Sequence, residues 1–219
     1  MAVRQGRRVG CGCIVPVELE PTPVILYEYQ KTRKKEHARE FLKDFRGICV
    51  TDGYQVYHSI ADEREDLTMA GCWSHARRGF ADVVKAAEKK DVGLRQSVAY
   101  KSLQLIQTMS RYEETFAKME PAERLEARIH YVLPLADAFF AYLKSKEGSV
   151  APKSATGKAI RYYLNQETFL RVFLTDGYVP MTNNAAERSI RPFTVGRNNW
   201  FQIDTVSGAK ASAIAYSIA

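Results

Sequence analysis

The spacing of apolar residues divides the chain into an alternating part and a long helical part. Between residues 24 and 73, short apolar and β-branched runs predict strands at 24–29, 48–51 and 67–73. Stretches with helical spacing lie between them, at 38–45 and 54–60. One further short strand is predicted near 13–17. Strands that alternate with helices favour an α/β arrangement with parallel pairing.

From Ser74 to about Asp176 the apolar positions follow helical spacing only. Helices are predicted at 80–87, 98–119, from 121 onward, at 135–143 and at 159–174. Another predicted helix starts at the pair Asn183-Asn184 and stops at Pro192, and a small-residue helix covers 208–219. We therefore predict an α/β part that is interrupted by an all-helical block.

The charge balance suggests a polyanionic partner. The 219 residues contain 32 Lys and Arg against 25 Asp and Glu, which gives a net charge of +7. Such an excess favours nucleic acid first and an anionic membrane surface second. No apolar run has the length of a membrane span, and the N-terminal residues do not resemble a secretory signal. The four cysteines are few for the length, which fits a reducing compartment. A cytoplasmic location is the expectation.

Two carboxylates stand out as candidates for a metal site. Asp52 follows a short apolar strand, and ligands gather at the carboxyl ends of parallel strands. Glu187 lies on the predicted helix after Asn183-Asn184, so both could hold magnesium through hard oxygen ligands. The alternatives are a simple turn at Asp52-Gly53 and an ion pair between Glu187 and Arg191.

Basic and aromatic residues near these acids are candidates for DNA contact. Arginine binds phosphate through two parallel hydrogen bonds, and an aromatic ring can stack on an unpaired base. The candidates are His75, Arg77, Arg78, Arg188, Arg191, Arg197 and Trp200. The alternatives are a solvated first helical turn around His75 and a core position for Trp200.

A zinc site is a further possibility. Cys11 and Cys13 form a Cys-x-Cys pair, and Cys72 and His75 form a Cys-x-x-His pair. Together they could supply four zinc ligands. Buried thiols and a separate histidine are the alternative.

Four motifs in order resemble the insertion-sequence-66 family of bacterial transposases. They are Val50-Thr51-Asp52-Gly53-Tyr54, Gly71-Cys72-Trp73-Ser74-His75-Ala76-Arg77-Arg78, Asn183-Asn184-Ala185-Ala186-Glu187-Arg188 and Gly196-Arg197-Asn198-Asn199-Trp200. The resemblance extends from about residue 24 to the end of the chain. It includes the segment from Pro152 to Ile160.

The resemblance implies a ribonuclease-H-like core with an Asp-Asp-Glu triad, two magnesium ions and DNA as substrate. Asp52 would be the second acid and Glu187 the third. The implied division is an atypical segment at 1–23, a partial core at 24–80, a helical insertion at 81–176, and the third-acid helix with the C-terminal segment at 177–219. The resemblance also implies DNA end cleavage and strand transfer, a place at the nucleoid, and possible self-association.

The first acid of the triad has no counterpart in this sequence. The family places it in an Asp-Glu-Thr motif before the strand at 24–29, whereas the first aspartate here is Asp44, on a predicted helix. We therefore expect a truncated or frameshifted transposase fragment that is inactive alone. A noncatalytic DNA-binding remnant and a zinc-stabilised structural module are the alternatives.

Overall fold

The structure is a computed structural model that describes residues 9–15, 24–30, 32, 34–87, 93–188 and 206–218. The chain divides into two compact units. The first contains Met1–Gly47, Ser59–Leu67 and Asn184–Ala219, and the second contains Ile48–His58 and Thr68–Asn183. Each unit is described by itself.

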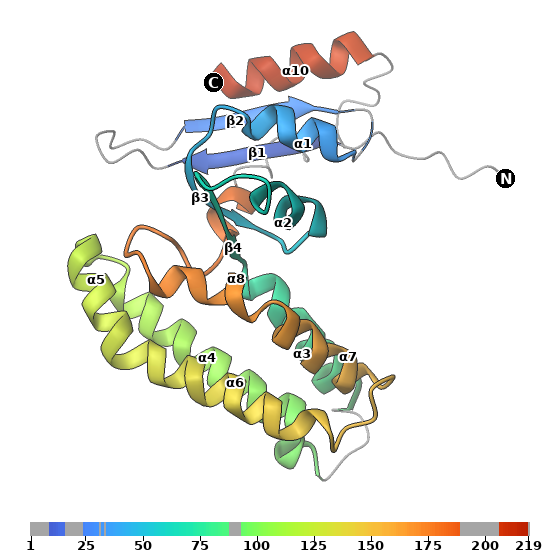
Figure 1. Cartoon of the computed structure of the whole chain (residues 1–219), viewed down its shortest axis with the longest axis vertical. Helices are drawn as coiled ribbons and strands as arrows, with labels where there is room; N and C mark the ends of the chain where they lie inside the picture. Colours follow the sequence, from blue (N-terminus) through green and yellow to red (C-terminus); the bar gives the residue numbers. More distant parts are fainter. Residues whose placement is uncertain are drawn as a thin grey trace, which may run out of the picture. The chain divides into compact units, whose positions relative to one another are not determined.

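The first unit is built around an antiparallel hairpin. Strand β1 (Val9–Val15) pairs with β2 (Val24–Tyr29), and helix α10 (Val206–Ile218) packs on β2 (Figure 1). The strand predicted at 24–29 is confirmed. The strand predicted near 13–17 lies earlier, and residues 16 and 17 are outside the described part. The predicted helix at 208–219 is confirmed within one or two residues.

Helix α1 (Lys35–Leu42) is held in the first unit by charged side chains. Glu63 accepts hydrogen bonds from Lys35 at 2.7 Å and from Arg39 at 2.8 Å. Arg64 donates to the backbone oxygens of Leu42 and Phe45, both at 2.6 Å. The guanidinium therefore binds the last carbonyl group of α1 and one three residues beyond it, which ties the end of the helix to Arg64.

A small parallel sheet carries the predicted α/β alternation. Strand β3 (Gly47–Thr51) pairs with β4 (Leu67–Gly71), and helix α2 (Gln55–Ala61) connects them. Beyond the end of β4, the Cys72 backbone N–H donates to the Thr51 oxygen at 3.0 Å. The predicted strand at 67–73 is two residues too long, because a helix already begins at Trp73.

Residues 73–174, here called the helical block, contain no strand in the part that the structure describes. Helix α3 (Trp73–Ala87) begins earlier than predicted, and the predicted helix at 159–174 is broken at Gln166, where the backbone leaves the α-helical conformation (φ −100°, ψ 3°). The other elements are η1 (Leu94–Gln96), α4 (Val98–Phe116), α5 (Pro121–Ala127), the π-helix η2 (Arg128–Val132), α6 (Leu133–Glu147), α7 (Ala155–Asn165), α8 (Glu167–Arg171) and η3 (Val172–Leu174).

Trp73 anchors the helical block to the end of β4. Its side chain is 1% exposed and contacts the rings of Phe139, Phe140, Tyr163 and Phe173. Its indole Nε1 donates to a backbone oxygen of α8, that of Leu170, at 2.8 Å. Burial of a large aromatic side chain with its only donor satisfied fixes the start of α3 against the block.

Candidate functional site

Asp52 lies directly after β3, at the carboxyl end of the parallel pair. Its carboxylate is exposed, and Oδ1 accepts a hydrogen bond from the Tyr54 backbone N–H at 3.1 Å. Gly53 has a φ of 80°, in the left-handed region that glycine tolerates best. The turn that the sequence offered as an alternative is therefore present, and it holds an acid at the edge where ligands of parallel sheets gather.

Tyr162 of α7 lies against this turn. A Cβ atom placed on Gly53 would be 2.6 Å from Tyr162 Oη, so the phenol lies directly over the glycine. The pKa of Tyr162 is raised first by partial burial and further by its electrostatic interactions with Asp52 and Cys72. Sequence reasoning missed Tyr162 as a site residue, since 110 residues separate it from Asp52.

The segment that leads into the Glu187 motif is held at the carboxyl end of β4. The Trp73 backbone N–H donates to the Met181 oxygen at 3.1 Å, and the Asn183 N–H donates to Cys72 Sγ at 3.4 Å. Because β3 and β4 are parallel, Asp52 and Asn183 lie at the same edge of the sheet. Asn183 Oδ1 is buried at this edge and has no hydrogen-bond partner among the described residues.

Glu187 belongs to the first unit, where residues 184–188 are helical as predicted. Its side chain is half-buried, and Arg188 is exposed. The suggested ion pair of Glu187 with Arg191 is not described, because Arg191 is outside the described residues. Three of the predicted DNA contacts lie outside them. They are Arg191, Arg197 and Trp200.

The remaining predicted contacts lie on α3. His75 is half-buried on the first turn, and Arg77 and Arg78 are exposed on the following turn. His75 follows Cys72, whose thiol is buried at the end of β4. His75 thus lies in the first turn of the helix that follows β4, and its predicted role in DNA contact stays a prediction.

The described residues do not by themselves complete a metal site. Asp52 offers the hard oxygen ligands that magnesium prefers, but no group of three or more His, Cys, Asp or Glu that could hold a metal ion occurs in the described part. The zinc hypothesis stays a prediction, since the side chains of Cys11 and Cys13 are outside that part.

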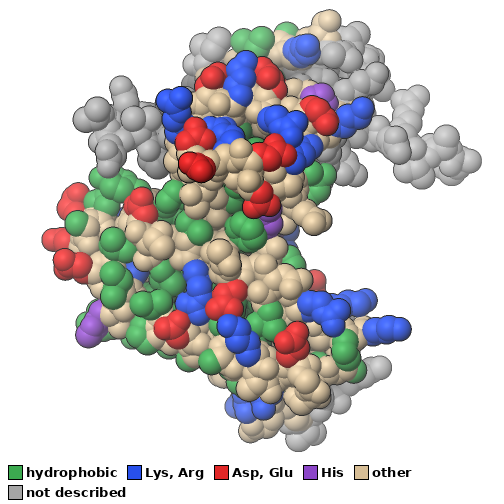
Figure 2. All heavy atoms as spheres, in the orientation of Figure 1, with side chains coloured by type: hydrophobic (Ala, Val, Ile, Leu, Met, Phe, Trp, Pro, Cys, Tyr) green, Lys and Arg blue, Asp and Glu red, His purple; other side chains and the backbone are tan. Residues whose placement is uncertain are grey.

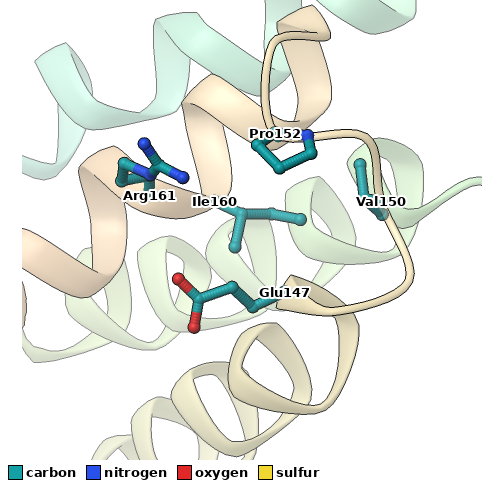
Figure 3. Close-up of a pocket in the computed structure, with 6 residues that line it drawn as sticks. Glu147, Val150, Pro152, Ile160 and Arg161 are labelled. Atoms are coloured by element: carbon teal, nitrogen blue, oxygen red, sulfur yellow. The ribbon is translucent and has the colours of Figure 1, made fainter.

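A pocket in the helical block is separate from these residues. It lies between the end of α6 and the start of α7 and is lined by Glu147, Val150, Pro152, Gly157, Ile160 and Arg161 (Figure 3). None of the predicted site residues lines it. We assign it no role in the site around Asp52.

The sequence matches the transposase IS66 family over residues 15–211, which is most of the chain. The chain belongs to the IS66 family of transposases.

Three proteins of Sinorhizobium fredii (strain NBRC 101917 / NGR234) are similar to this chain, and all three are described as uncharacterized. Protein y4qI is 32% identical over 81% of this chain and 33% of its own length. Protein y4hP is 30% identical over 90% of this chain and 37% of its own length. Protein y4jD is 28% identical over 90% of this chain and 38% of its own length. The chain thus spans little more than a third of the length of these relatives.

No solved structure matches the chain. Among the described helices, none has both the length and the apolar character needed to cross a membrane.

Proposed function

We propose that this chain carries two acids, Asp52 and Glu187, of the catalytic site of a DDE transposase with a ribonuclease-H-like core. The observation that carries the proposal is the placement of two motif segments at the carboxyl edge of the β3–β4 sheet. Asp52 lies at one strand end, and the segment entering the Glu187 motif is hydrogen-bonded at the other. The antiparallel β1–β2 hairpin and the β3–α2–β4 unit are the kinds of element that such a core combines.

Chain connectivity supports the pairing of the two acids. Asn183 is tied to Cys72, and Glu187 follows four residues later in a helical stretch. We propose that Asp52 and Glu187 act on the same phosphate, with Arg77, Arg78 and Arg188 contacting neighbouring phosphates.

The proposed reaction has two steps. A water oxygen attacks the phosphorus at the element end, the bond from phosphorus to the 3′ oxygen breaks, and a 3′ hydroxyl and a 5′ phosphate result. That 3′ hydroxyl then attacks a target phosphorus, a new phosphodiester forms, and the displaced 3′ oxygen takes up a proton. The family resemblance implies a divalent cation for this chemistry, and magnesium is the proposed ion.

The 219-residue chain is expected to be inactive when tested alone. The implied triad needs its first acid, an aspartate, before β2. This sequence has no aspartate before Asp44. A noncatalytic DNA-binding protein that competes for the element ends is therefore the second candidate. The proposed partners are DNA and a second copy of the chain, at the nucleoid in the cytoplasm.

Strand transfer with labelled element ends and magnesium tests this proposal. We expect DNA binding at low salt without strand transfer. Robust strand transfer that Glu187→Gln abolishes would show that the expected inactivity is wrong. Failure to bind any DNA at low salt would contradict both candidates.

Iron-directed cleavage tests the pairing of the acids without requiring activity. Fe²⁺ bound in place of magnesium reacts with added hydrogen peroxide to give Fe³⁺, hydroxide and a hydroxyl radical that cuts the backbone nearby, and added ascorbate regenerates the Fe²⁺. We expect cuts near both Asp52 and Glu187, with both sets lost in Asp52→Asn and in Glu187→Gln. Cuts near one acid that persist when the other is replaced would contradict a shared ion.

A further inference from the structure

Helices α3 and α7 cross at close range beside the Asp52 turn. A Cβ atom on Gly79 would lie 3.3 Å from the Cβ of Ala159, so the two helices approach closely there (Figure 1). The rings of Phe80 and Tyr163 stack at 5.2 Å behind the crossing and fix the two helices together. The residues next to the crossing are therefore held on a rigid support.

The exposed side of this helix pair is basic. Arg78 and Lys85 lie seven residues apart on α3, on one face, and Lys158 is exposed on α7 next to Ala159. Helix α7 contains no acid, and the only acid on α3 is Asp82. None of the three basic side chains has an ion pair with the described residues. Figure 2 shows Lys and Arg side chains gathered on the side of the helical block where α3 and α7 lie.

A surface with a net positive charge is suited to a polyanion. Elsewhere in the second unit, basic residues such as Arg128, Lys144 and Arg171 have carboxylate partners. On the α3/α7 face Asp82 lies between Arg78 and Lys85, but the three basic side chains against this one acid leave a net positive charge, which attracts phosphates and raises the rate of association.

Tyr162 connects this face to Asp52. Lys158 and Tyr162 are four residues apart and share a face of α7, while the Tyr162 phenol lies over Gly53. About 36% of Tyr162 is exposed, so its ring is accessible beside the acid.

We propose that Arg78, Lys158 and Tyr162 form a DNA track on the helical block that leads a DNA backbone to Asp52. Arg78 and Lys158 bind phosphates, and the Tyr162 ring contacts the nucleotide nearest Asp52. This inference rests on the proposed function, because it takes DNA as the substrate. It adds a role for the helical block, which positions the DNA strand as well as supporting the sheet.

Fluorescence anisotropy with a labelled DNA duplex and the full 219-residue chain tests the track. The variant Arg78→Ala/Lys158→Ala is expected to weaken binding by roughly tenfold and to reduce the slope of log binding constant against log salt by about two. The matched control is Arg111→Ala/Lys118→Ala, which removes two exposed charges on and just after α4. The control is expected to keep the wild-type slope.

Tyr162 is tested by two replacements in the same assay. Tyr162→Phe keeps the ring and is expected to bind like wild type, whereas Tyr162→Ala is expected to lose about fivefold or more, as when a stacking aromatic is removed. Circular dichroism of each variant establishes that it is folded. Equal losses in the track and control variants, or no loss in the track variant, would overturn the track while leaving the proposed function standing. Absence of binding by the wild-type chain would overturn both.

Discussion

At the scale of single residues, the Asp52-Gly53 turn is the most constrained point of the site. Gly53 adopts a positive φ and has the Tyr162 hydroxyl directly over its Cα. Two separate costs therefore oppose any side chain there, one from the backbone conformation and one from the contact. The glycine leaves the adjacent acid exposed on a rigid turn.

Replacing Gly53 with alanine is expected to destabilise the chain by about 2 kcal/mol, because both costs apply. Tyr162→Phe removes the hydroxyl that the new Cβ would meet, so the double variant should recover about half of the loss. Urea unfolding of the wild type, both single variants and the double variant measures this coupling. Purely additive effects would show that the phenol does not constrain the turn.

At the scale of elements, a buried ion pair joins the π-helix η2 to α4, and further hydrogen bonds from the same arginine reach η3 and the residues just after it. Arg128 is 1% exposed and binds both carboxylate oxygens of Glu113, at 2.9 and 2.7 Å. It also donates to the backbone oxygens of Phe173 at 2.7 Å and Asp176 at 2.8 Å. The guanidinium thus has partners on three segments at once.

Removing this guanidinium should be costly. Arg128→Ala leaves Glu113 and two backbone oxygens without their donor, and we expect a loss of about 3–5 kcal/mol in the free energy of unfolding. Lys144→Ala is the control, since it removes the exposed partner of a pair whose Glu167 keeps its second partner, Arg171, and should cost less than about 1 kcal/mol. Chemical denaturation of both variants makes the comparison. Similar losses would show that burial of Arg128 does not matter.

The hydrogen bond from the Trp73 indole to the Leu170 backbone oxygen is a second contact between elements, since it joins α3 to α8. Trp73→Phe keeps most of the apolar contact but leaves the Leu170 oxygen without its donor, so we expect a loss of about 1–3 kcal/mol. Thermal unfolding of the variant measures it. The matched change Phe139→Leu, which also reduces an aromatic core side chain but removes no hydrogen bond, separates the packing effect from the lost donor.

At the scale of the whole molecule, the core of the second unit should make stability sensitive to alkaline pH. Burial raises the pKa of Tyr163 well above its usual value, and the neighbouring Tyr162 raises it further, against a smaller opposing effect of Arg77. The folded state therefore keeps this phenol protonated at a pH where the unfolded chain releases the proton, above about 10. Stability is fully present below that pH and falls as the pH rises.

Tyr163→Phe should remove part of this alkaline loss. The Tyr163 hydroxyl has no hydrogen-bond partner among the described residues, so its deletion should cost little at neutral pH. Urea unfolding at pH 8 and at pH 10.5 compares the two proteins. An alkaline loss of the same size in wild type and variant would assign the effect to other groups.

Much of the local structure was predictable because its causes are local. The strands at 24–29 and 48–51, the helix at 98–119 and the helical character of residues 184–188 follow from the spacing of neighbouring side chains. Errors occurred where distant contacts set an end. The strand at 67–73 stops early because Trp73 is taken into the core, and the helix at 159–174 breaks at Gln166.

By itself, the sequence determined the family, the order of the motifs and the position of Asp52 after a strand. Each of these depends on residues that are adjacent or one helical turn apart. Only the tertiary structure brought Tyr162 to Gly53, Asn183 to Cys72 and Arg128 to Glu113. Such contacts form because packing brings distant segments together, and no periodicity in the sequence reports which segments will meet.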